Sequence, residues 1–351
     1  MKKFFKKKSF IKNYLMVICF ILIGGAGLTG CQKNSTDTAA QNGENTAEKE
    51  ILTEESINTG EETAGEKTEE IGEEGTKVVS TIMGDVEVPV NPKRVIVNWY
   101  LGDVVTLGIE PVAIYGWIQE SMPFYDSLKD IPSIENWEKE EVLSYEPDLI
   151  ITYNQEDFDK FSKIAPVVVA PESTMTSVER IEFLGSVTGR ETEAKAAIDD
   201  FETKLGEAKD LLKADEFLDK TFSILQDWGS NSYGIYYETG SRGGTLLYDY
   251  LQLNLPENLK KLVEDTGEGR GALSYEVASD YFGDYVLWFL LDENESEYSQ
   301  TEIWKSIPAV KAGNIIEVPA SLSGLFYFDD VASMTAQMDY IVDKLNEAVS
   351  K

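Results

Sequence analysis

Histidine and cysteine, two side chains that carry much of the acid–base, metal and nucleophilic chemistry of proteins, are almost missing from this chain. The sequence has no histidine, and its two cysteines, Cys19 and Cys31, lie near the N-terminus. A Ser-His-Asp triad, a histidine general base, the usual zinc sites and a haem held by His or Cys are therefore excluded. An all-carboxylate Ca²⁺ site and haem ligation by Tyr or Met stay open.

Paired carboxylates are the remaining candidates for catalysis, because glycosidases work through two such groups. Acidic pairs occur in "YFDDV" at residues 327–331 and in "ENES" at residues 293–296, but nothing in their spacing marks them as catalytic. We therefore expect no enzyme, no catalytic residue, no cofactor and no metal bound directly by the protein. A surface hydrolase that uses paired carboxylates is the alternative from a different functional class.

The N-terminal segment has the order of a secretory signal, with basic residues first and an apolar stretch after them. Six lysines precede the uncharged residues 14–29, and Leu-Thr-Gly-Cys follows at residues 28–31. This tetrapeptide resembles the lipobox of bacterial lipoproteins, in which the cysteine thiol is acylated before cleavage. We expect residues 1–30 to be the signal peptide and Cys31 to anchor the chain in the lipid membrane. An ordinary signal that leaves an unused thiol is the alternative.

Residues 31–76 differ from the rest of the chain in composition. Between residues 32 and 76 there is no aromatic side chain, and 13 acidic residues face 3 lysines. Such a segment buries too little apolar area to offset its chain entropy, so we expect a disordered acidic tether after the lipidated cysteine. The whole chain has a net charge of −32, which makes nucleic acid a poor partner.

The globular part begins near residue 77 and alternates short strands with helices. Buried strands are expected in "KRVIVNWY", "GIEPVAIYG", "PDLIITY" and "APVVVAP", and later in "KTFSILQDW", "GDYVLWFLL" and "NIIEVP". Thr176 and Glu179 have capping-box spacing, and Gly189 separates a first helix from a long second one. We expect an α/β fold with a first lobe at 77–188, a connecting helix within 189–213 and a second lobe at 214–351.

The order of several motifs resembles the substrate-binding proteins of iron-siderophore and vitamin B12 ABC importers. The motifs are "GDVEVPVNPKRVIV", "LGIEPVAI", "EEVLSYEPDLIITY", "FSKIAPVVV", "LGSVTGRETEA", "LSYEVASDYFGDYVLW" and "YFDDVASMTAQMDYIVDKL". The resemblance implies two Rossmann-like lobes joined by a single long α-helix, with the ligand in the cleft between them. It also implies an extracytoplasmic protein that works with an ABC permease and its ATPase. No dinucleotide fingerprint follows a strand.

The same resemblance implies that one glutamate on each lobe docks on the permease. Glu140 in "EEVLSYEPD" and Glu276 in "LSYEVASD" match these positions, with the adjacent Glu141 as an alternative in the first lobe. Two carboxylates at opposite ends of a rigid body would set the register and the association rate more than the affinity. The competing interpretation is that they are ordinary members of an acidic surface.

The stretch at residues 228–256 resembles the second-lobe segment of hydroxamate-siderophore binders, in which an arginine beside glycines reaches the metal-bound oxygens. This implies that Arg242 binds ligand, because a guanidinium offers several donors in a planar fork. The expected aromatic partners are Trp228, Tyr233, Tyr236 and Tyr237 in the second lobe, and Trp99, Tyr100 and Trp117 after strand ends in the first. A turn arginine and aromatic side chains that belong to the core are the alternatives.

The number of arginines favours one class of siderophore. The chain has only Arg94, Arg180, Arg190, Arg242 and Arg270, whereas ferric catecholate and citrate complexes are strongly anionic and demand several cations in the cleft. Ferric trihydroxamates are nearly neutral or weakly positive, so we expect the ligand to be a ferric hydroxamate siderophore. Lysines in the cleft would overturn this argument, and cobalamin or another chelate is the alternative within the family. We expect the protein to be a monomer.

Overall fold

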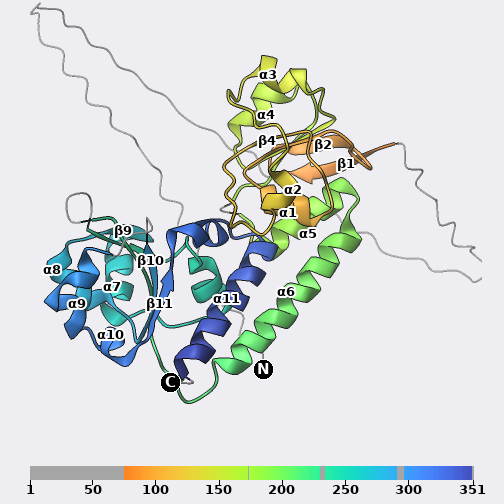
Figure 1. The fold of residues 1–351 in the computed structure, drawn as a ribbon. Helices are drawn as coiled ribbons and strands as arrows, with labels where there is room; N and C mark the ends of the chain where they lie inside the picture. Colours follow the sequence, from red (N-terminus) through yellow and green to blue (C-terminus); the bar gives the residue numbers. More distant parts are fainter. Residues whose placement is uncertain (1–74, 173, 230–233, 291–295, 350–351) are drawn as a thin grey trace, which may run out of the picture. The chain divides into compact units, whose positions relative to one another are not determined.

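The computed structural model describes residues 75–349 except 173, 230–233 and 291–295, and these residues belong to one compact unit (Figure 1). The expected signal peptide, the lipidated Cys31, the tether up to residue 74 and Tyr233 lie outside the described residues. Among the described residues, none of the helices combines the length and the apolar character needed to cross a bilayer.

The first lobe is built on a parallel sheet of four strands in the order β4-β3-β5-β6. Its strands are β3 (Val95–Asn98), β4 (Ala113–Tyr115), β5 (Leu149–Thr152) and β6 (Val167–Val169). Every residue of β3, β5 and β6 is buried, as expected for short apolar strands that are covered on both faces. The four first-lobe strands predicted from the sequence are thus confirmed.

An antiparallel hairpin of β1 (Thr76–Thr81) and β2 (Gly84–Pro89) precedes this sheet. The helices of the first lobe come between and after its strands. They are α1 (Leu101–Thr106), α2 (Tyr125–Leu128), α3 (Lys139–Ser144), α4 (Glu156–Phe161) and α5 (Ser177–Thr188).

The second lobe contains a five-stranded sheet in the order β11-β10-β7-β8-β9. Its strands are β7 (Phe222–Asp227), β8 (Ile235–Glu238), β9 (Arg270–Leu273), β10 (Tyr285–Leu290) and β11 (Ile315–Val318). Strands β7, β10 and β11 are parallel, as expected, but β8 and β9 pair antiparallel, so the sheet is mixed. The connection from β7 to β8 is too short for a parallel crossover, which needs a dozen or more residues.

Short helical segments surround the second sheet and precede the long C-terminal helix. They are η1 (Thr245–Tyr250), which is a π-helix, α7 (Glu257–Thr266), α8 (Tyr275–Ala278), η2 (Ser279–Tyr281), η3 (Tyr298–Gln300), α9 (Glu302–Ser306), α10 (Pro308–Ala312), η4 (Ala320–Phe326) and α11 (Val331–Val349).

The long helix α6 (Glu191–Leu211) connects the two lobes, inside the range predicted from the sequence. The predicted capping box is present at the start of α5, where the Thr176 hydroxyl accepts from the Glu179 backbone N–H and the Glu179 carboxylate accepts from the Thr176 N–H. Gly189 ends α5 with a φ of 70°, a left-handed conformation that favours glycine. The chain can therefore turn directly from α5 into α6.

The C-terminal helix α11 contacts both lobes, because it packs against β11 and η4 of the second lobe, where the sequence places it, and also against the first lobe. It packs along α6 and also contacts α1 and α5, and α6 and α11 run side by side in Figure 1. Helix α6 buries Ala194, Phe201 and Ala208, which are seven residues apart and form one stripe. The start of α11 thereby lies next to α1 and α5, and the lobes share an apolar core there.

Candidate functional site

A cavity of about 240 Å³ lies between the lobes and opens to solvent. The first lobe contributes Trp99 and Glu172, which follow the ends of β3 and β6. This position agrees with the rule that ligands bind outside the carboxyl ends of parallel strands. The second lobe contributes three stretches: Gly240–Gly243 with Thr245, Phe326–Asp329, and Gln337 of α11.

Arg242 reaches the cavity from the turn between β8 and η1. Its backbone has a φ of 55°, and Gly243 follows with a φ of 89°. A Cβ at Gly244 would come within 2.5 Å of the Thr239 carbonyl carbon, so the turn needs glycine there. The backbone conformation of this Gly-rich turn therefore positions the Arg242 side chain at the cavity.

The Arg242 guanidinium is half-buried and has few protein partners. It lies 5.2 Å from the centre of the Tyr327 ring, and its Nη1 donates to the Ser323 carbonyl oxygen at a long 3.4 Å. No carboxylate forms an ion pair with it among the described residues. Burial lowers the pKa of Arg242, with nearby Arg270 acting in the same direction. The arrangement leaves most of its donors available for a ligand.

Trp99 supplies the aromatic wall of the first lobe. It has a φ of 76° directly after β3, a conformation that non-glycine residues rarely adopt and that is often found at functional sites. Its ring lies 5.8 Å from Tyr327 and 5.1 Å from Phe328, both of the second lobe. Trp117, which is 44% exposed, lies 4.6 Å from Tyr327. Trp99, Trp117 and Arg242 thus meet around Tyr327.

Two of the expected ligand-binding aromatics lie in the core instead. Tyr100 is 3% exposed, its hydroxyl donates to the Ala170 carbonyl oxygen, and its ring stacks on Arg180. Tyr237 is also 3% exposed, and its hydroxyl donates to the Glu268 carbonyl oxygen. Neither tyrosine lines the cavity that contains Arg242, and their expected contact with a ligand stays a prediction. Side chains alternate between the two faces of a strand or a strand end. Tyr100, which directly follows the cavity residue Trp99, therefore points away from the cavity.

Trp228 and Tyr236 form a separate group with an arginine that the sequence analysis did not select. The Arg270 guanidinium lies 5.0 Å from the Tyr236 ring and 5.9 Å from the Trp228 ring. Its Nε pairs at 3.0 Å with the buried Glu238, which also accepts hydrogen bonds from Gln226 and Ser241. These two aromatics do not line the cavity that contains Arg242.

Several cavity residues were not selected from the sequence. They are Glu172, Phe326, Tyr327, Phe328, Asp329 and Gln337. The motif "YFDDV" indicates an acidic pair and the start of a family landmark, and its aromatic residues before a helix start were the missed signal. Its second aspartate, Asp330, does not line the cavity but caps α11, because its carboxylate accepts from the backbone N–H and the hydroxyl of Ser333.

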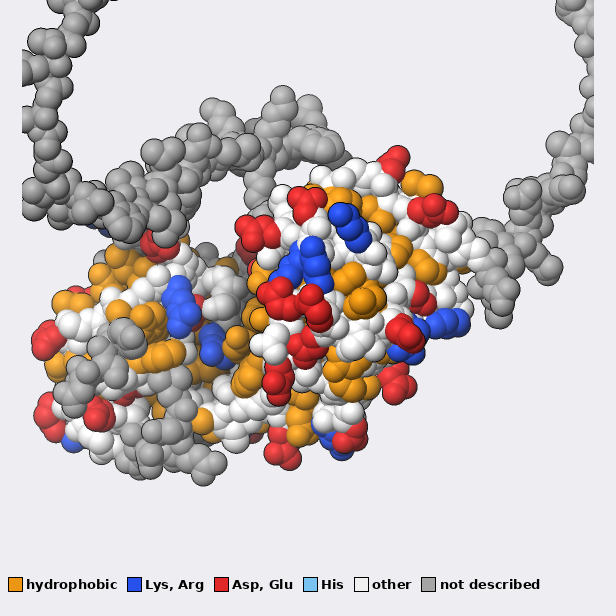
Figure 2. Space-filling model, turned by 90° about the horizontal axis from the view of Figure 1, so that it is seen from above, with side chains coloured by type: hydrophobic (Ala, Val, Ile, Leu, Met, Phe, Trp, Pro, Cys, Tyr) orange, Lys and Arg blue, Asp and Glu red, His pale blue; other side chains and the backbone are white. Residues whose placement is uncertain are grey.

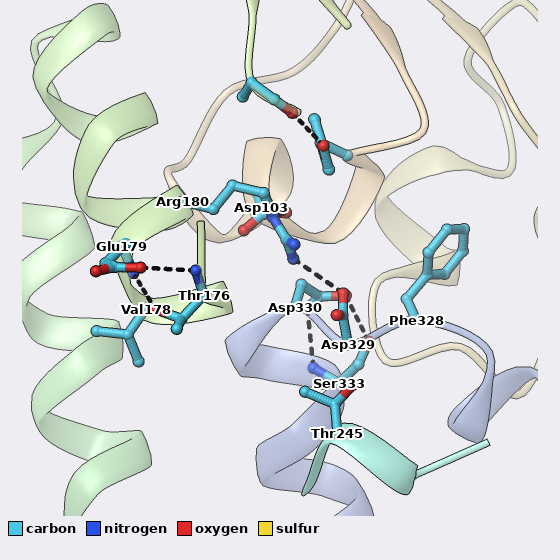
Figure 3. A network of polar contacts seen from close by, with 12 residues as sticks. Asp103, Thr176, Val178, Glu179, Arg180, Thr245, Phe328, Asp329, Asp330 and Ser333 are labelled. Atoms are coloured by element: carbon cyan, nitrogen blue, oxygen red, sulfur yellow. Dashed lines mark hydrogen bonds and ion pairs between the residues drawn. The ribbon is translucent and has the colours of Figure 1, made fainter. Parts of the chain in front are cut away.

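A buried ionic network lies beside the cavity (Figure 3). The Arg180 Nε atom is 2.9 Å from Asp103 Oδ2, and its Nη2 atom is 3.2 Å from Asp329 Oδ1. Because Arg180 and Asp103 belong to α5 and α1 while Asp329 precedes α11, the network joins the two lobes. Burial raises the pKa of Asp103 to about 7, against the opposing effect of Arg180.

The three candidate docking glutamates have different surroundings. Glu140 is exposed on α3, whereas Glu141 is half-buried and its carboxylate accepts the backbone N–H groups of Glu135 at 2.9 Å and Asn136 at 2.7 Å. Glu276 is exposed on α8, and a hydrogen bond from Ser274 lowers its pKa. Of the two neighbours in the first lobe, Glu140 is thus the one with its carboxylate free of these backbone contacts.

The charged side chains on one face of the molecule are mostly acidic (Figure 2). On the face shown in Figure 2, carboxylates are spread over the described part, and the basic side chains occur in small groups among them. This distribution gives no extended basic strip of the kind that tracks a nucleic-acid backbone on the face shown.

Known proteins resemble this chain in sequence. A family model described as "Periplasmic binding protein" matches residues 100–322. The iron(3+)-hydroxamate-binding protein YxeB of Bacillus subtilis is 31% identical over 293 residues, which covers 81% of this chain and 88% of that protein. The iron(3+)-hydroxamate-binding protein FhuD of the same organism is 29% identical over 273 residues, covering 75% of this chain and 84% of the relative.

Solved structures resemble this chain in fold. FhuD2 of Staphylococcus aureus with bound ferrioxamine B has a TM-score of 0.61 and 25% identity, covering 73% of this chain and 99% of that one. A FhuD-fold protein of Bacillus subtilis has a TM-score of 0.62 and 29% identity, covering 76% and 98%. With its α/β lobes, its connecting helix and the match over residues 100–322, the chain belongs to the periplasmic binding protein family.

Proposed function

We propose that this protein captures a ferric hydroxamate siderophore outside the cytoplasm and delivers it to an ABC permease. The observation that carries the proposal is Arg242, a half-buried guanidinium in an aromatic cavity between the lobes, with one long hydrogen bond to the protein. The relatives named as iron(3+)-hydroxamate-binding proteins support it. They favour a hydroxamate over cobalamin, and the protein catalyses no reaction in this proposal.

The chemistry of the cavity suits such a ligand. Hydroxamate oxygens around Fe³⁺ carry partial negative charge, and a guanidinium offers them several N–H donors in one plane. Trp99, Tyr327 and Phe328 present ring faces and edges that pack against the aliphatic arms of the chelate. The iron belongs to the cargo and keeps its siderophore ligands, so no protein side chain has to coordinate it.

The ligand assignment is tested by titrating the Lys77–Lys351 part of the chain and following tryptophan fluorescence. The ligands are ferrioxamine B, ferrichrome, a ferric catecholate, ferric citrate and cobalamin. We expect saturable quenching by the hydroxamates and at least tenfold weaker binding by Arg242→Ala, since a charge-assisted hydrogen bond is lost. Binding of another chelate alone would contradict the ligand class, and silence with all five would contradict the binding function.

We further propose that Glu140 and Glu276 dock on the permease. Both are exposed, whereas Glu141 is engaged by backbone N–H groups. An exposed apolar side chain accompanies each: Leu143 is 56% exposed one turn after Glu140, and Val277 is 43% exposed next to Glu276. An acidic group beside an apolar one is suited to a contact that combines charge steering with desolvation.

Docking is separated from ligand capture by comparing uptake with binding. In Glu140→Gln and Glu276→Gln, we expect lower uptake of a radiolabelled ferric hydroxamate by cells that carry the permease, with the dissociation constant of the purified protein unchanged. Glu207→Gln, an exposed glutamate on α6, is the matched control. Normal uptake by the double variant would refute the docking role.

The membrane attachment is part of the same proposal. We propose that Cys31 is acylated and holds a monomeric protein on the outer face of the cell membrane, supported by the tetrapeptide before it and by the name of one relative, a probable siderophore-binding lipoprotein of Bacillus subtilis that is 28% identical. Cys31→Ser should release the protein into the medium, as detected by immunoblotting of the membrane and soluble fractions. An unchanged membrane fraction would refute the anchor.

A further inference from the structure

The cavity contains more hydrogen-bond acceptors than a ferric chelate core can use. Arg242 supplies donors for the hydroxamate oxygens, but Glu172, Asp329 and Gln337 also line the same cavity, and their exposed or unused oxygens are acceptors. Ionised carboxylates and an amide oxygen cannot form hydrogen bonds with a hydroxamate oxygen, because all of these oxygens are acceptors. These three groups therefore need a separate explanation.

Gln337 gives the sharpest observation. Its side chain is 1% exposed, and its Nε2 atom donates to the carbonyl oxygens of Leu325 and Phe328, both at 2.9 Å. Because two carbonyl oxygens lie on the same side of the Gln337 amide, the atom that faces them must be the nitrogen, which donates hydrogen bonds. The opposite atom, Oε1, is buried and has no hydrogen-bond partner among the described residues. A buried acceptor of this kind is costly unless a donor reaches it.

The space before this oxygen is kept open by a glycine. A Cβ at Gly243 would lie 3.8 Å from Gln337 Oε1 and 3.2 Å from the Phe326 ring. Gly243 and Gln337 both line the cavity, so the buried amide oxygen lies close to the cavity wall on the side where Gly243 has no side chain. The orphaned acceptor thus belongs to a residue of the cavity wall.

The two carboxylates leave negative charge uncompensated at the cavity. Asp329 shares Arg180 with the buried Asp103, and its own side chain is 50% exposed. Glu172 accepts a hydrogen bond from the Trp99 side chain, yet partial withdrawal from water and the nearby Asp329 raise its pKa. The Arg180 guanidinium is thus shared by Asp103 and Asp329 and also acts on Glu172, so a further cation placed between Glu172 and Asp329 would be favoured.

We propose that Glu172 and Asp329 bind a protonated amine on the siderophore, with Gln337 Oε1 as a further acceptor for its N–H groups. The protein would then select ferric hydroxamates that carry a cationic arm over neutral ones. This specificity rests on the proposed function of the same cavity, in which Arg242 holds the iron-bound oxygens and the acceptors hold the amine.

The test uses two ligands that differ only in this charge. Ferrioxamine B has a terminal amine, and its N-acetylated form is neutral with the same trihydroxamate core. Fluorescence titration at pH 7.5 should show about tenfold tighter binding of the amine form to the unaltered protein. In Glu172→Gln with Asp329→Asn, the ratio of the two dissociation constants should fall toward one, whereas Glu207→Gln should keep it.

A third variant tests the amide oxygen separately. Gln337→Met removes the acceptor and retains the apolar length of the side chain, and it should lower the ratio less than the double variant. Circular dichroism shows whether each variant is folded before its ratio is compared.

The outcomes distinguish this inference from the proposed function. Equal binding of both ligands would refute the cationic-arm site and leave the hydroxamate function standing. A preference that survives in the double variant would also refute it, because the amine would then be bound elsewhere. Failure to bind either ligand would overturn both.

Discussion

Arg180 and Arg242 both lie where the two lobes meet, but their surroundings are opposite. The Arg180 side chain is 4% exposed, pairs with Asp103 and Asp329, and stacks on Tyr100. The Arg242 side chain is half-buried, stacks on Tyr327, and has one long hydrogen bond to a backbone carbonyl. Arg180 is therefore satisfied by the protein, whereas Arg242 retains donors that a ligand can use.

Arginine therefore serves two purposes at the same interface. A buried guanidinium must be paired, because its desolvation is too costly otherwise, and such a pair holds its elements in register. A guanidinium at a cavity is useful only if it is not already paired. The structural arginine and the binding arginine differ in how deeply the guanidinium is buried and in which groups it pairs with. The residue type alone does not distinguish them.

The largest expected effect comes from removing the structural arginine. Arg180→Met leaves Asp103 buried without its cation and should lower the free energy of unfolding by about 3–5 kcal/mol. Urea unfolding followed by circular dichroism measures this loss. Arg242→Met, which breaks no ion pair among the described residues, should change the same quantity by less than about 1 kcal/mol.

The loss in Arg180→Met should depend on pH. The pKa of Asp103 is already raised by burial above its usual range, and it should rise further without Arg180. The native state then binds a proton that the unfolded state releases, so stability increases as the pH falls. The destabilisation should therefore be smaller at pH 5 than at pH 8. An equal loss at both values would show that Asp103 stays ionised.

Crowding the network is expected to have the next largest effect. A Cβ on Gly102 of α1 would lie 2.3 Å from the Asp330 carboxylate at the start of α11, so Gly102→Ala should destabilise by about 1–3 kcal/mol. Gly206→Ala on α6 is the matched control, since a Cβ there meets nothing within 4 Å and should stabilise by about 0.4–1 kcal/mol. Thermal unfolding should show a lower melting temperature for Gly102→Ala and a higher one for Gly206→Ala. An unchanged melting temperature for Gly102→Ala would mean that Asp330 can move.

A charge-conserving change tests the binding arginine more gently. Arg242→Lys keeps the positive charge but loses the planar fork and most of the stacking on Tyr327. We expect about tenfold weaker binding of ferrioxamine B, with the free energy of unfolding nearly unchanged. Isothermal titration calorimetry measures the affinity, and full affinity in the lysine variant would show that charge alone is required.

The smallest expected effect is on the pH dependence of ligand choice. Partial desolvation, with Asp329 acting in the same direction, raises the pKa of Glu172, while the Trp99 side chain and Arg180 oppose the rise. Glu172 should therefore lose its charge at a higher pH than an ordinary glutamate. The preference for ferrioxamine B over its N-acetylated form should weaken as the pH is lowered from 8 to 5. A preference independent of pH would exclude Glu172 from the amine site.

The local features of the chain were predictable because they depend on neighbouring residues. The capping box of Thr176 and Glu179, the turn at Gly189 and the long helix after it are set by contacts within a few residues. Composition also settled which chemistries are excluded, since a chain without histidine lacks the corresponding groups in any fold.

The pairing of distant residues was decided only by the tertiary structure. Tyr100 lies beside Trp99 in the sequence, yet one points into the core and the other lines the cavity, because adjacent side chains leave the backbone in different directions. Asp329 meets Arg180 across 149 positions of the chain, and Gln337 reaches the cavity because α11 packs where the two lobes meet. The motifs of the sequence therefore indicated the family that the chain resembles, and local patterns indicated its helices and strands, whereas long-range packing decided which arginine is sealed and which remains open to a ligand.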